Sequence, residues 1–407
     1  MTRRLPIGIQ DFVSIRKDGF LYVDKTARIH ELVTGSGKVF FLSRPRRFGK
    51  SLLCSTLGAL FEGRRELFGS MAGQPPLAID SLDWEWKTHP VIRIDLNTGD
   101  YEKGTEELSV TIKRMLELCA GKYDVPFTGE TLSDFFARLI FSLHEKYKEK
   151  VVVLIDEYDK PLLSTIDMPE KHGVIRNALK SFYGVLKSSD EYLQLVFLTG
   201  VTKFAHVSVF SDLNNVTDIS MIPRFYDLCG ITQEELERDF AGEIAAVLED
   251  KHTDRQSYLA EVKRFYNGYR FSEKPETVYN PFGLLNHFNE EGKFNAYWFA
   301  TGTPTFLITL IEKQKIDILN LEKERVTGFD FQRFDVENMD AVPVLYQSGY
   351  LTIVGYDEEL GEYALDYPNE EVRGSFAEAL LDYYVKKYET GIKPSALAVP
   401  KALLHGD

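Results

Sequence analysis

Short apolar runs alternate with segments of helical periodicity over the first 230 residues. The runs are nearly continuous in hydrophobicity and rich in β-branched and aromatic residues, which is typical of strands buried on both faces of a parallel sheet. They cover residues 39–43, 91–96, 151–155 and 195–199, with a fifth candidate at 215–220. Helical stretches lie between them, near 50–62, 105–120, 131–148 and 171–188. This alternation predicts an α/β fold, with a doubly wound, mostly parallel sheet and right-handed crossovers.

From about residue 231 the pattern becomes helical. Thr232 is followed by an acid at the third helical position, which is a helix start signal. Further helices are expected near 254–265, 281–290 and 304–313. Residues 344–353 have the pattern of a helix end, a glycine turn and a strand, and a second strand follows an acidic turn at 363–367. A helix that leads into a two-stranded ribbon is the outline of a winged helix.

Composition excludes several classes of protein. Hydrophobic residues make up 44% of the 407 residues and aromatic residues 13%, which is enough to build cores and argues against disorder. The longest aliphatic run, 151–155, is far shorter than the roughly 20 residues of a membrane helix. No apolar stretch follows the N-terminus, and the three cysteines match no disulfide or metal spacing. We therefore expect a soluble, cytoplasmic protein that does not bind membranes.

Charge is distributed unevenly along the chain. Residues 1–70 carry 13 basic and 6 acidic side chains, whereas the rest of the chain carries 35 basic and 56 acidic ones. A basic segment on an acidic body indicates one local anion site rather than a broad polyphosphate-binding surface.

The most specific motif is the segment 43–51, SRPRRFGKS, which follows a strand and opens a helix. That context is the one a phosphate-binding loop requires, because N–H groups at a helix start and the helix dipole stabilise a phosphate. Gly49 would let the backbone approach closely, Lys50 would reach the β- and γ-phosphates, and the Ser51 hydroxyl would ligate Mg²⁺. The predicted nucleotide-contacting residues of this segment are Arg46, Arg47, Phe48, Gly49, Lys50, Ser51 and Leu52.

One position departs from the general loop pattern, since Arg44 stands where the first glycine is expected. The loop must therefore begin differently, and Pro45 could fix its entry. A basic surface turn before an ordinary helix is the alternative interpretation.

The acidic partner of the loop is at the end of the strand 151–155. Asp156 would lie at the carboxyl end of this strand and hold Mg²⁺ as the second acid of a nucleotide–metal site. Glu157 would orient and polarise the attacking water. Asp159 is better interpreted as a structural acid. The alternative is that Asp156 and Glu157 merely cap the next turn.

The strand at 91–96 lies between the loop and the acidic strand in the sequence. This insertion, with a glutamate directly after the metal-binding aspartate, marks the branch of phosphate-loop ATPases (the ASCE type) that includes AAA-type switch ATPases. In that branch the strand after the acidic one ends in a polar residue that senses the γ-phosphate. Thr199 is our first candidate for that role and Thr202 the second. A threonine that only satisfies local backbone is the alternative.

Six motifs together resemble the prokaryotic AAA-ATPase-like family. They are 22–26 (YVDKT), 44–51 (RPRRFGKS), 156–161 (DEYDKP), 266–269 (YNGY), 297–304 (YWFATGTP) and 367–372 (YPNEEV). The resemblance implies an ATPase core at 1–230, a helical lid at 231–335 and a winged-helix-like module at 336–385. It also implies that Arg44 is usual at its position. ATP and Mg²⁺ are the cofactors that the family implies.

Members of this family often continue into a PD-(D/E)XK-type nuclease domain. We expect that domain to be absent here, with 386–407 as the linker toward it, because no acid/Glu-x-Lys constellation occurs in the tail. In related ATPases the segment before the first strand contacts adenine and ribose. This likeness makes Asp24, Lys25 and Thr26 candidate nucleotide contacts, with Ile15 or Tyr22 as a base-stacking surface. A helix cap at Asp24 beside a core Tyr22 is the alternative.

Three functions fit these observations. The first is an Mg²⁺-dependent ATPase that acts as a switch on a protein partner, a second copy or an attached effector domain. The second is a nucleic-acid-binding module, which is disfavoured by the acids of the expected wing at 357–366. The third is a nucleotide-binding scaffold without turnover. Arg224 is a candidate arginine finger, although a plain surface arginine is the interpretation we favour.

Overall fold

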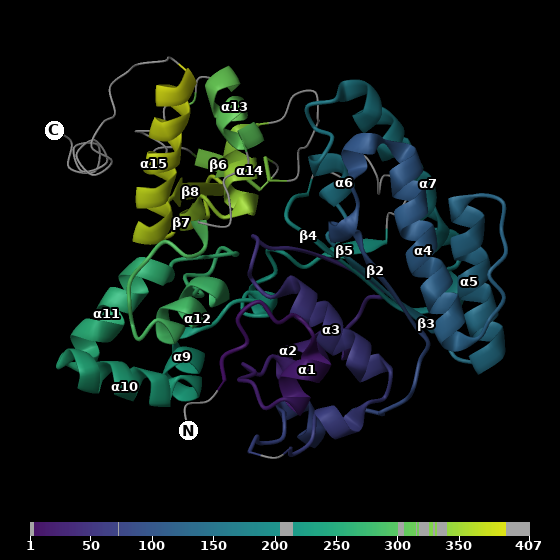
Figure 1. Ribbon diagram of the computed structural model, residues 1–407, viewed down its shortest axis with the longest axis horizontal. Coiled ribbons are helices and arrows are strands. Elements are labelled where there is room, and N and C mark those ends of the chain that lie inside the picture. Colours follow the sequence, from purple (N-terminus) through teal and green to yellow (C-terminus); the bar gives the residue numbers. More distant parts are fainter. Residues whose placement is uncertain are drawn as a thin grey trace.

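The computed structural model describes residues 4–71, 73–203, 215–299, 305–314, 316, 325–328, 330–331 and 340–387. A five-stranded parallel sheet forms the centre of the N-terminal part (Figure 1). Its strands are β1 (Val39–Ser43), β2 (Val91–Asp95), β3 (Val151–Asp156), β4 (Leu193–Gly200) and β5 (Val216–Asp218). The order across the sheet is β2-β3-β4-β1-β5. This order confirms the predicted α/β class, and it inserts β4 between the strand that leads into the loop and the acidic strand.

Helices cover both faces of this sheet because its side chains alternate between two cores. Val153 and Ile155 of β3 point into one core, and Val152 and Leu154 point into the other. The first core is closed by α4 (Thr105–Tyr123), α5 (Leu132–Tyr147) and α7 (Pro169–Ser188). The second core, on the other face of the sheet, is covered by α1 (Phe12–Lys17), α2 (Thr26–Thr34) and α3 (Lys50–Phe61) (Figure 1). A short helix, α6 (Lys160–Leu163), follows β3.

A separate group of helices follows the sheet, as the periodicity predicts. It contains α9 (Gln233–Asp239), α10 (Ala241–Lys251), α11 (Arg255–Tyr266) and α12 (Pro281–Asn289). Thr232 caps α9 in a complete capping box, since its side chain accepts from the Glu235 N–H and the Glu235 carboxylate accepts from the Thr232 N–H. These helices enclose a third core, which also takes up Leu21 from the N-terminal segment.

The C-terminal elements are α13 (Thr305–Gln314), β6 (Arg325–Thr327), α14 (Ala341–Ser348), β7 (Thr352–Asp357), β8 (Glu362–Asp366) and α15 (Glu370–Lys387). The helix, glycine turn and antiparallel ribbon lie where the sequence predicts them. The structure adds β6, which pairs with β8, and it packs α13 against α14. The predicted boundary at residue 335 therefore divides one sheet. A three-residue strand carries too little periodicity to be found in the sequence.

Parts of the sequence predictions concern residues that lie outside the described ranges. The motif 297–304 is described only to Phe299, and the tail from 388 onward, which includes most of the predicted linker 386–407, lies outside the described residues. In the described part of the chain, no helix is both long enough and apolar enough to cross a membrane.

A buried carboxyl group joins α15 to the segment before residue 300. Glu371 is 1% exposed, and its Oε1 accepts a hydrogen bond of 2.6 Å from the Trp298 N–H. Its Oε2 has no hydrogen-bond partner in the described structure. Burial raises the pKa of Glu371 to about 8, although the N–H groups of Trp298 and Phe299 act in the opposite direction.

This environment predicts a pH-dependent stability. Because the pKa of Glu371 is raised on folding, its contribution is fully present below its ordinary pKa and is lost as the pH rises toward 8. Glu371→Gln keeps an oxygen for the Trp298 N–H and cannot ionise. We expect its free energy of unfolding to fall less between pH 5 and 8 than that of the parent, by at least about 1.4 kcal/mol, the equivalent of one pKa unit. Urea unfolding at several pH values measures this.

The matched control is Glu370→Gln. The side chain of Glu370 is 45% exposed and forms a surface ion pair with Arg264. This variant should keep the pH slope of the parent. Identical slopes for all three proteins would contradict the assignment of a buried, protonated Glu371.

Candidate nucleotide-binding site

The loop that joins β1 to α3 has an unusual backbone. Arg47 and Gly49 both lie in the left-handed region, with φ of +65° and +94°. Gly49 is the N-cap of α3, and an L side chain is strained in that conformation. Within the described part of the chain, the N–H groups of Arg47, Phe48 and Gly49 have no hydrogen-bond partner. Successive N–H groups in such a turn at a helix start form a concave anion-binding site.

Lys50 begins α3 and is 3% exposed. Its Nζ donates to the carbonyl oxygens of Arg44 and Pro45, both at 3.1 Å. The same Nζ lies 3.4 Å from Glu157 Oε1. The structure therefore brings the predicted phosphate-binding lysine next to the predicted catalytic glutamate, although the two residues are far apart in the sequence.

The second predicted pair also meets. Ser51 at the start of α3 lies close to Asp156, which is 7% exposed at the end of β3. Burial raises the pKa of Asp156 to about 6, and the charge of Glu157 adds to the rise, whereas the nearby Ser51 hydroxyl lowers it. Two hard oxygen donors at this place suit Mg²⁺, whose remaining positions are usually filled by phosphate oxygens and waters. No cluster of three or more His, Cys, Asp or Glu side chains in the described residues forms a separate metal site.

Asp156 and Glu157 point to different partners. Asp156 faces Ser51, whereas Glu157 faces Lys50, as expected of neighbours at a strand end. Glu157 has a φ of +53°, so it is the second non-glycine residue of the site, after Arg47, in the left-handed region. Asp159 is fully buried, and one of its oxygens accepts from the Thr202 N–H and hydroxyl, both at 2.7 Å. Burial raises the pKa of Asp159. These bonds agree with its interpretation as a structural acid.

The two threonine candidates differ in their surroundings. The Thr202 hydroxyl is engaged by Asp159, whereas the Thr199 hydroxyl oxygen is buried and has no partner in the described structure. In the β3–β4 register Ile155 lies opposite Leu198, so Thr199 follows level with Asp156. Thr199 therefore remains the better candidate for sensing a phosphate.

Two loop residues have structural roles that their type does not suggest. Arg44 is 1% exposed, donates to the carbonyl oxygens of Ser43, Ser220 and Phe225, and stacks on Phe271 at 4.0 Å. The position that usually holds glycine thus holds a cation that ties three backbone segments together. The Phe48 side chain is 1% exposed and packs edge-on against Tyr269 and Phe271, so it anchors the loop in the core.

Two cavities adjoin the loop. A polar cleft of about 600 Å³ is lined by the loop, by Glu157 and by three residues that the sequence analysis missed, Asp95, Asn97 and Lys160. Asp95 lies opposite Asp156 in the register of β2 and β3, so its strand-end position was the available signal. A smaller apolar cavity of about 100 Å³ is lined by Tyr22, Leu52 and Ile231, among others. Both cavities share Gly49, Leu52 and Pro281 as lining residues.

The N-terminal residues predicted to contact the nucleotide mostly make contacts within the protein. Asp24 accepts from the Thr26 N–H and hydroxyl and from the Ala78 N–H, so it joins two backbone segments. The N-cap of α2 is Lys25 rather than Asp24. Lys25 lines the apolar cavity, and its Nζ forms an ion pair of 2.6 Å with Glu235. Ile15 is completely buried in the core, whereas Tyr22 faces the apolar cavity.

Arg224 is exposed, and its guanidinium lies over the neighbouring Phe225 ring at 4.7 Å. This placement agrees with a surface arginine.

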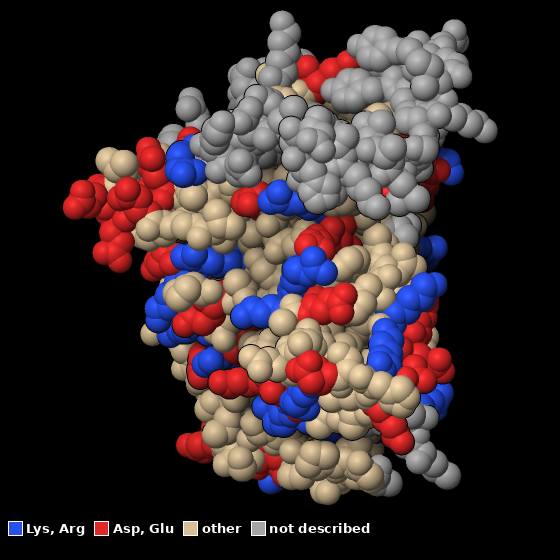
Figure 2. All heavy atoms as spheres, turned by 90° about the vertical axis from the view of Figure 1, so that its left-hand side faces the viewer, with Lys and Arg blue, Asp and Glu red and all other residues tan. Residues whose placement is uncertain are grey.

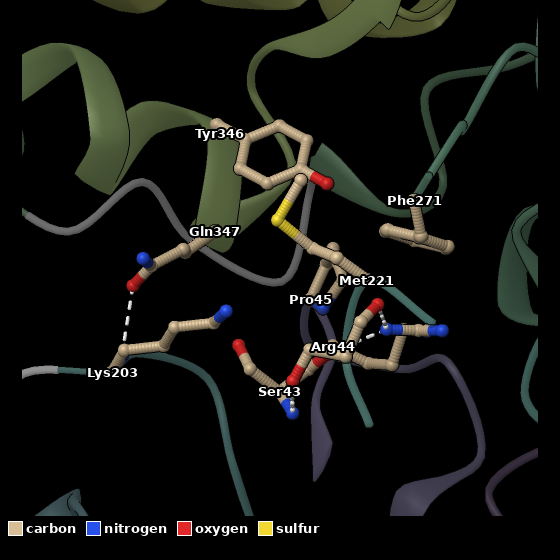
Figure 3. A pocket seen from close by; sticks show the side chains of 9 residues that line it. Ser43, Arg44, Pro45, Lys203, Met221, Phe271, Tyr346 and Gln347 are labelled. Carbon is tan, nitrogen blue, oxygen red and sulfur yellow. Dashed lines mark hydrogen bonds between the residues drawn. The ribbon is translucent and has the colours of Figure 1, made fainter. Parts of the chain in front are cut away.

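The C-terminal elements contact the loop directly. Figure 3 shows Tyr346 and Gln347 of α14 facing Ser43, Arg44 and Pro45 across a cavity of about 10 Å³, which has room for one water at most. The Gln347 side chain accepts from the Lys203 N–H at 2.8 Å. At the end of α14, Gly349 has a φ of +91°, and a Cβ there would lie 2.7 Å from Pro45 Cβ.

Comparisons with known proteins identify the family. The family model described as "Predicted AAA-ATPase" matches residues 6–210, and the chain belongs to this family. The chain is similar to an "Uncharacterized protein in vnfD 5'region" of Azotobacter chroococcum mcd 1, with 39% identity over 387 residues that cover 94% of this chain and 71% of that protein. A solved structure of the Aeropyrum pernix ORC2 protein, in ADPNP-ADP complexes, aligns with a TM-score of 0.30 and 12% identity over 89% of this chain and 92% of that chain.

The glycine contact gives a prediction on packing. Gly349→Ala should destabilise the protein through the left-handed backbone and also through the clash with Pro45. Gly361→Ala is the matched control, since Gly361 has a φ of +66° and open space around it. We expect urea unfolding to show a loss that is at least about 1 kcal/mol larger for Gly349→Ala, the lower end of an overpacking cost. Equal losses in the two variants would contradict a tight contact at Pro45.

Proposed function

We propose that this protein binds ATP with Mg²⁺, hydrolyses it, and uses the nucleotide state as a switch. The observation that carries this proposal is the convergence of Lys50, Ser51, Asp156 and Glu157 at the carboxyl ends of β1 and β3, beside unpaired loop N–H groups. Ligands of open α/β sheets bind at this edge. The family of the chain supports the same class of function.

Each residue has a distinct role in this proposal. The loop N–H groups and Lys50 bind the phosphates, and the nearby apolar cavity takes the base. Ser51 and Asp156 would hold Mg²⁺, which when bound offsets phosphate charge. Glu157 accepts the proton of the attacking water, and Thr199 contacts the γ-phosphate. Before Glu157 can do so, a phosphate must draw Lys50 away from it, because the two side chains form an ion pair.

The helices after residue 231 would act as the lid, and the elements from α13 to α15 as the winged-helix-like module. The pairing of β6 with β8 and the packing of α13 against α14 support including α13 and β6 in that module, although the sequence predicts its start at residue 336. A protein partner, a second copy or an effector domain would receive the signal.

No observation favours nucleic acid as the partner. The ribbon of β7 and β8 carries Asp357 at its turn, where Glu358 and Glu359 follow. On the face in Figure 2, acidic and basic side chains are interspersed, and no continuous basic area is visible among the described residues.

Removal of the loop ammonium tests nucleotide binding. Lys50→Ala should weaken ATP binding at least tenfold, which corresponds to about 1.4 kcal/mol. Titration calorimetry with ATP and Mg²⁺ measures the affinity. Lys103→Ala, at a side chain that is 68% exposed, serves as the control and should bind like the parent. Unchanged binding in Lys50→Ala would refute the phosphate loop.

Removal of the carboxylate tests turnover. Glu157→Gln keeps the shape of the side chain but cannot accept a proton from water. We expect ATP affinity within threefold of the parent and phosphate release lower by a factor of about 10² to 10⁴. Glu66→Gln, at a surface position that is 64% exposed, should hydrolyse ATP at the parent rate.

The outcome separates the alternatives. Parent-like phosphate release by Glu157→Gln would exclude Glu157 as the base. A parent protein that binds ATP but releases no phosphate would favour the scaffold function.

A further inference from the structure

A tryptophan outside the residues matched by the family model contacts the phosphate loop. The Trp298 indole Nε1 donates a hydrogen bond of 3.0 Å to the carbonyl oxygen of Arg46. Trp298 is 4% exposed. Its position in the sequence is more than two hundred residues beyond the loop, so only the fold creates this contact.

Trp298 is itself held in place from two sides. Its backbone N–H donates to Glu371 Oε1 at 2.6 Å. Its ring lies against Tyr350, with the ring centroids 5.4 Å apart, and close to Gly349, whose added Cβ would be 3.4 Å from Trp298 Cζ2. The indole therefore has little freedom to leave the Arg46 carbonyl.

The hydrogen bond from Trp298 also orients the Arg47 N–H, because the Arg46 carbonyl and the Arg47 N–H belong to the same peptide group. In a trans peptide the C=O and the N–H of the next residue point in opposite directions, and no cis peptide occurs among the described residues. When the indole fixes the Arg46 carbonyl, it also directs the Arg47 N–H away from Trp298. That N–H is one of the unpaired loop donors, and Arg46 and Arg47 both line the polar cleft.

We propose that Trp298 is a positioning residue, which aims the Arg47 N–H at the phosphates of the nucleotide by holding the Arg46 carbonyl. The inference rests on the proposed function, because the donor needs a phosphate to bind. It assigns to the C-terminal part of the chain a direct share in nucleotide binding. The strained φ of +65° at Arg47 explains why an external contact is needed, since a left-handed non-glycine residue does not hold itself in place.

The test compares two tryptophan-to-phenylalanine changes in the full chain. Trp298→Phe keeps an aromatic ring and removes the N–H donor. Trp84→Phe makes the same chemical change at an indole whose Nε1 has no partner in the described structure. The affinity for ATP with Mg²⁺ is measured by calorimetry, and the melting temperature is measured without nucleotide.

We expect Trp298→Phe to bind ATP about five- to tenfold more weakly than the parent, the loss of roughly one hydrogen bond. Trp84→Phe should bind ATP like the parent, and the two variants should melt within a few degrees of each other. Equal ATP affinity for the parent and both variants would overturn the positioning role and leave the proposed function intact. A parent protein that binds no ATP would overturn both.

A second measurement remains if Trp298→Phe does not fold. The chain has three tryptophans, so Trp84→Phe/Trp86→Phe leaves Trp298 alone, and its indole proton gives one ¹⁵N–¹H signal. We expect this proton to exchange with D₂O slowly, and more slowly once ATP and Mg²⁺ are added. Exchange as fast as that of a free indole, with ATP bound, would overturn the proposal.

Discussion

The loop between β1 and α3 has a backbone that its own hydrogen bonds do not stabilise, and the proposed function depends on keeping it in place. The N–H groups of Arg47, Phe48 and Gly49 are unpaired, so the loop lacks the internal hydrogen bonds that stabilise ordinary turns. It also keeps Arg47, which is not a glycine, in the left-handed region. Such strain persists only where the surroundings over-determine the conformation. Residues from several other parts of the fold contact the loop and supply those surroundings.

Three parts of the molecule meet this constraint. Arg44 ties the loop entry to the ends of β1 and β5 through carbonyl oxygens and through its stack on Phe271. Phe48 anchors the loop in the aromatic cluster with Tyr269. The third part is formed by Trp298, which lies between α12 and α13, and by Gly349 at the end of α14. The residues that hold the loop therefore come from several regions of the chain, so a movement of Trp298 or α14 would change the loop contacts.

The buried ammonium of Lys50 also depends on contacts from other parts of the site. Lys50 is almost fully buried, and a buried ammonium is stable only where oxygen atoms surround it. Two loop carbonyls and Glu157 supply those oxygens. In the proposed function, a phosphate would offer Lys50 further acceptors, so nucleotide binding would also release Glu157 from its ion pair.

The sequence by itself determined the sheet, most of the long helices, and the loop and acid motifs, because these features rest on local periodicity and on residues adjacent in the chain. The sequence indicates that Lys50 lies near Glu157 and Ser51 near Asp156 only because phosphate-loop motifs are usually accompanied by an acidic strand. It does not indicate the role of Arg44. Only the tertiary structure decided that Thr202 is bound to Asp159, that Asp24 accepts from the Ala78 N–H, and that β6 joins the C-terminal sheet. It alone placed Trp298 on the Arg46 carbonyl. The physical reason is that a hydrogen bond between distant segments leaves no periodicity in either of them, so the contact exists only once the packing of the whole chain is fixed.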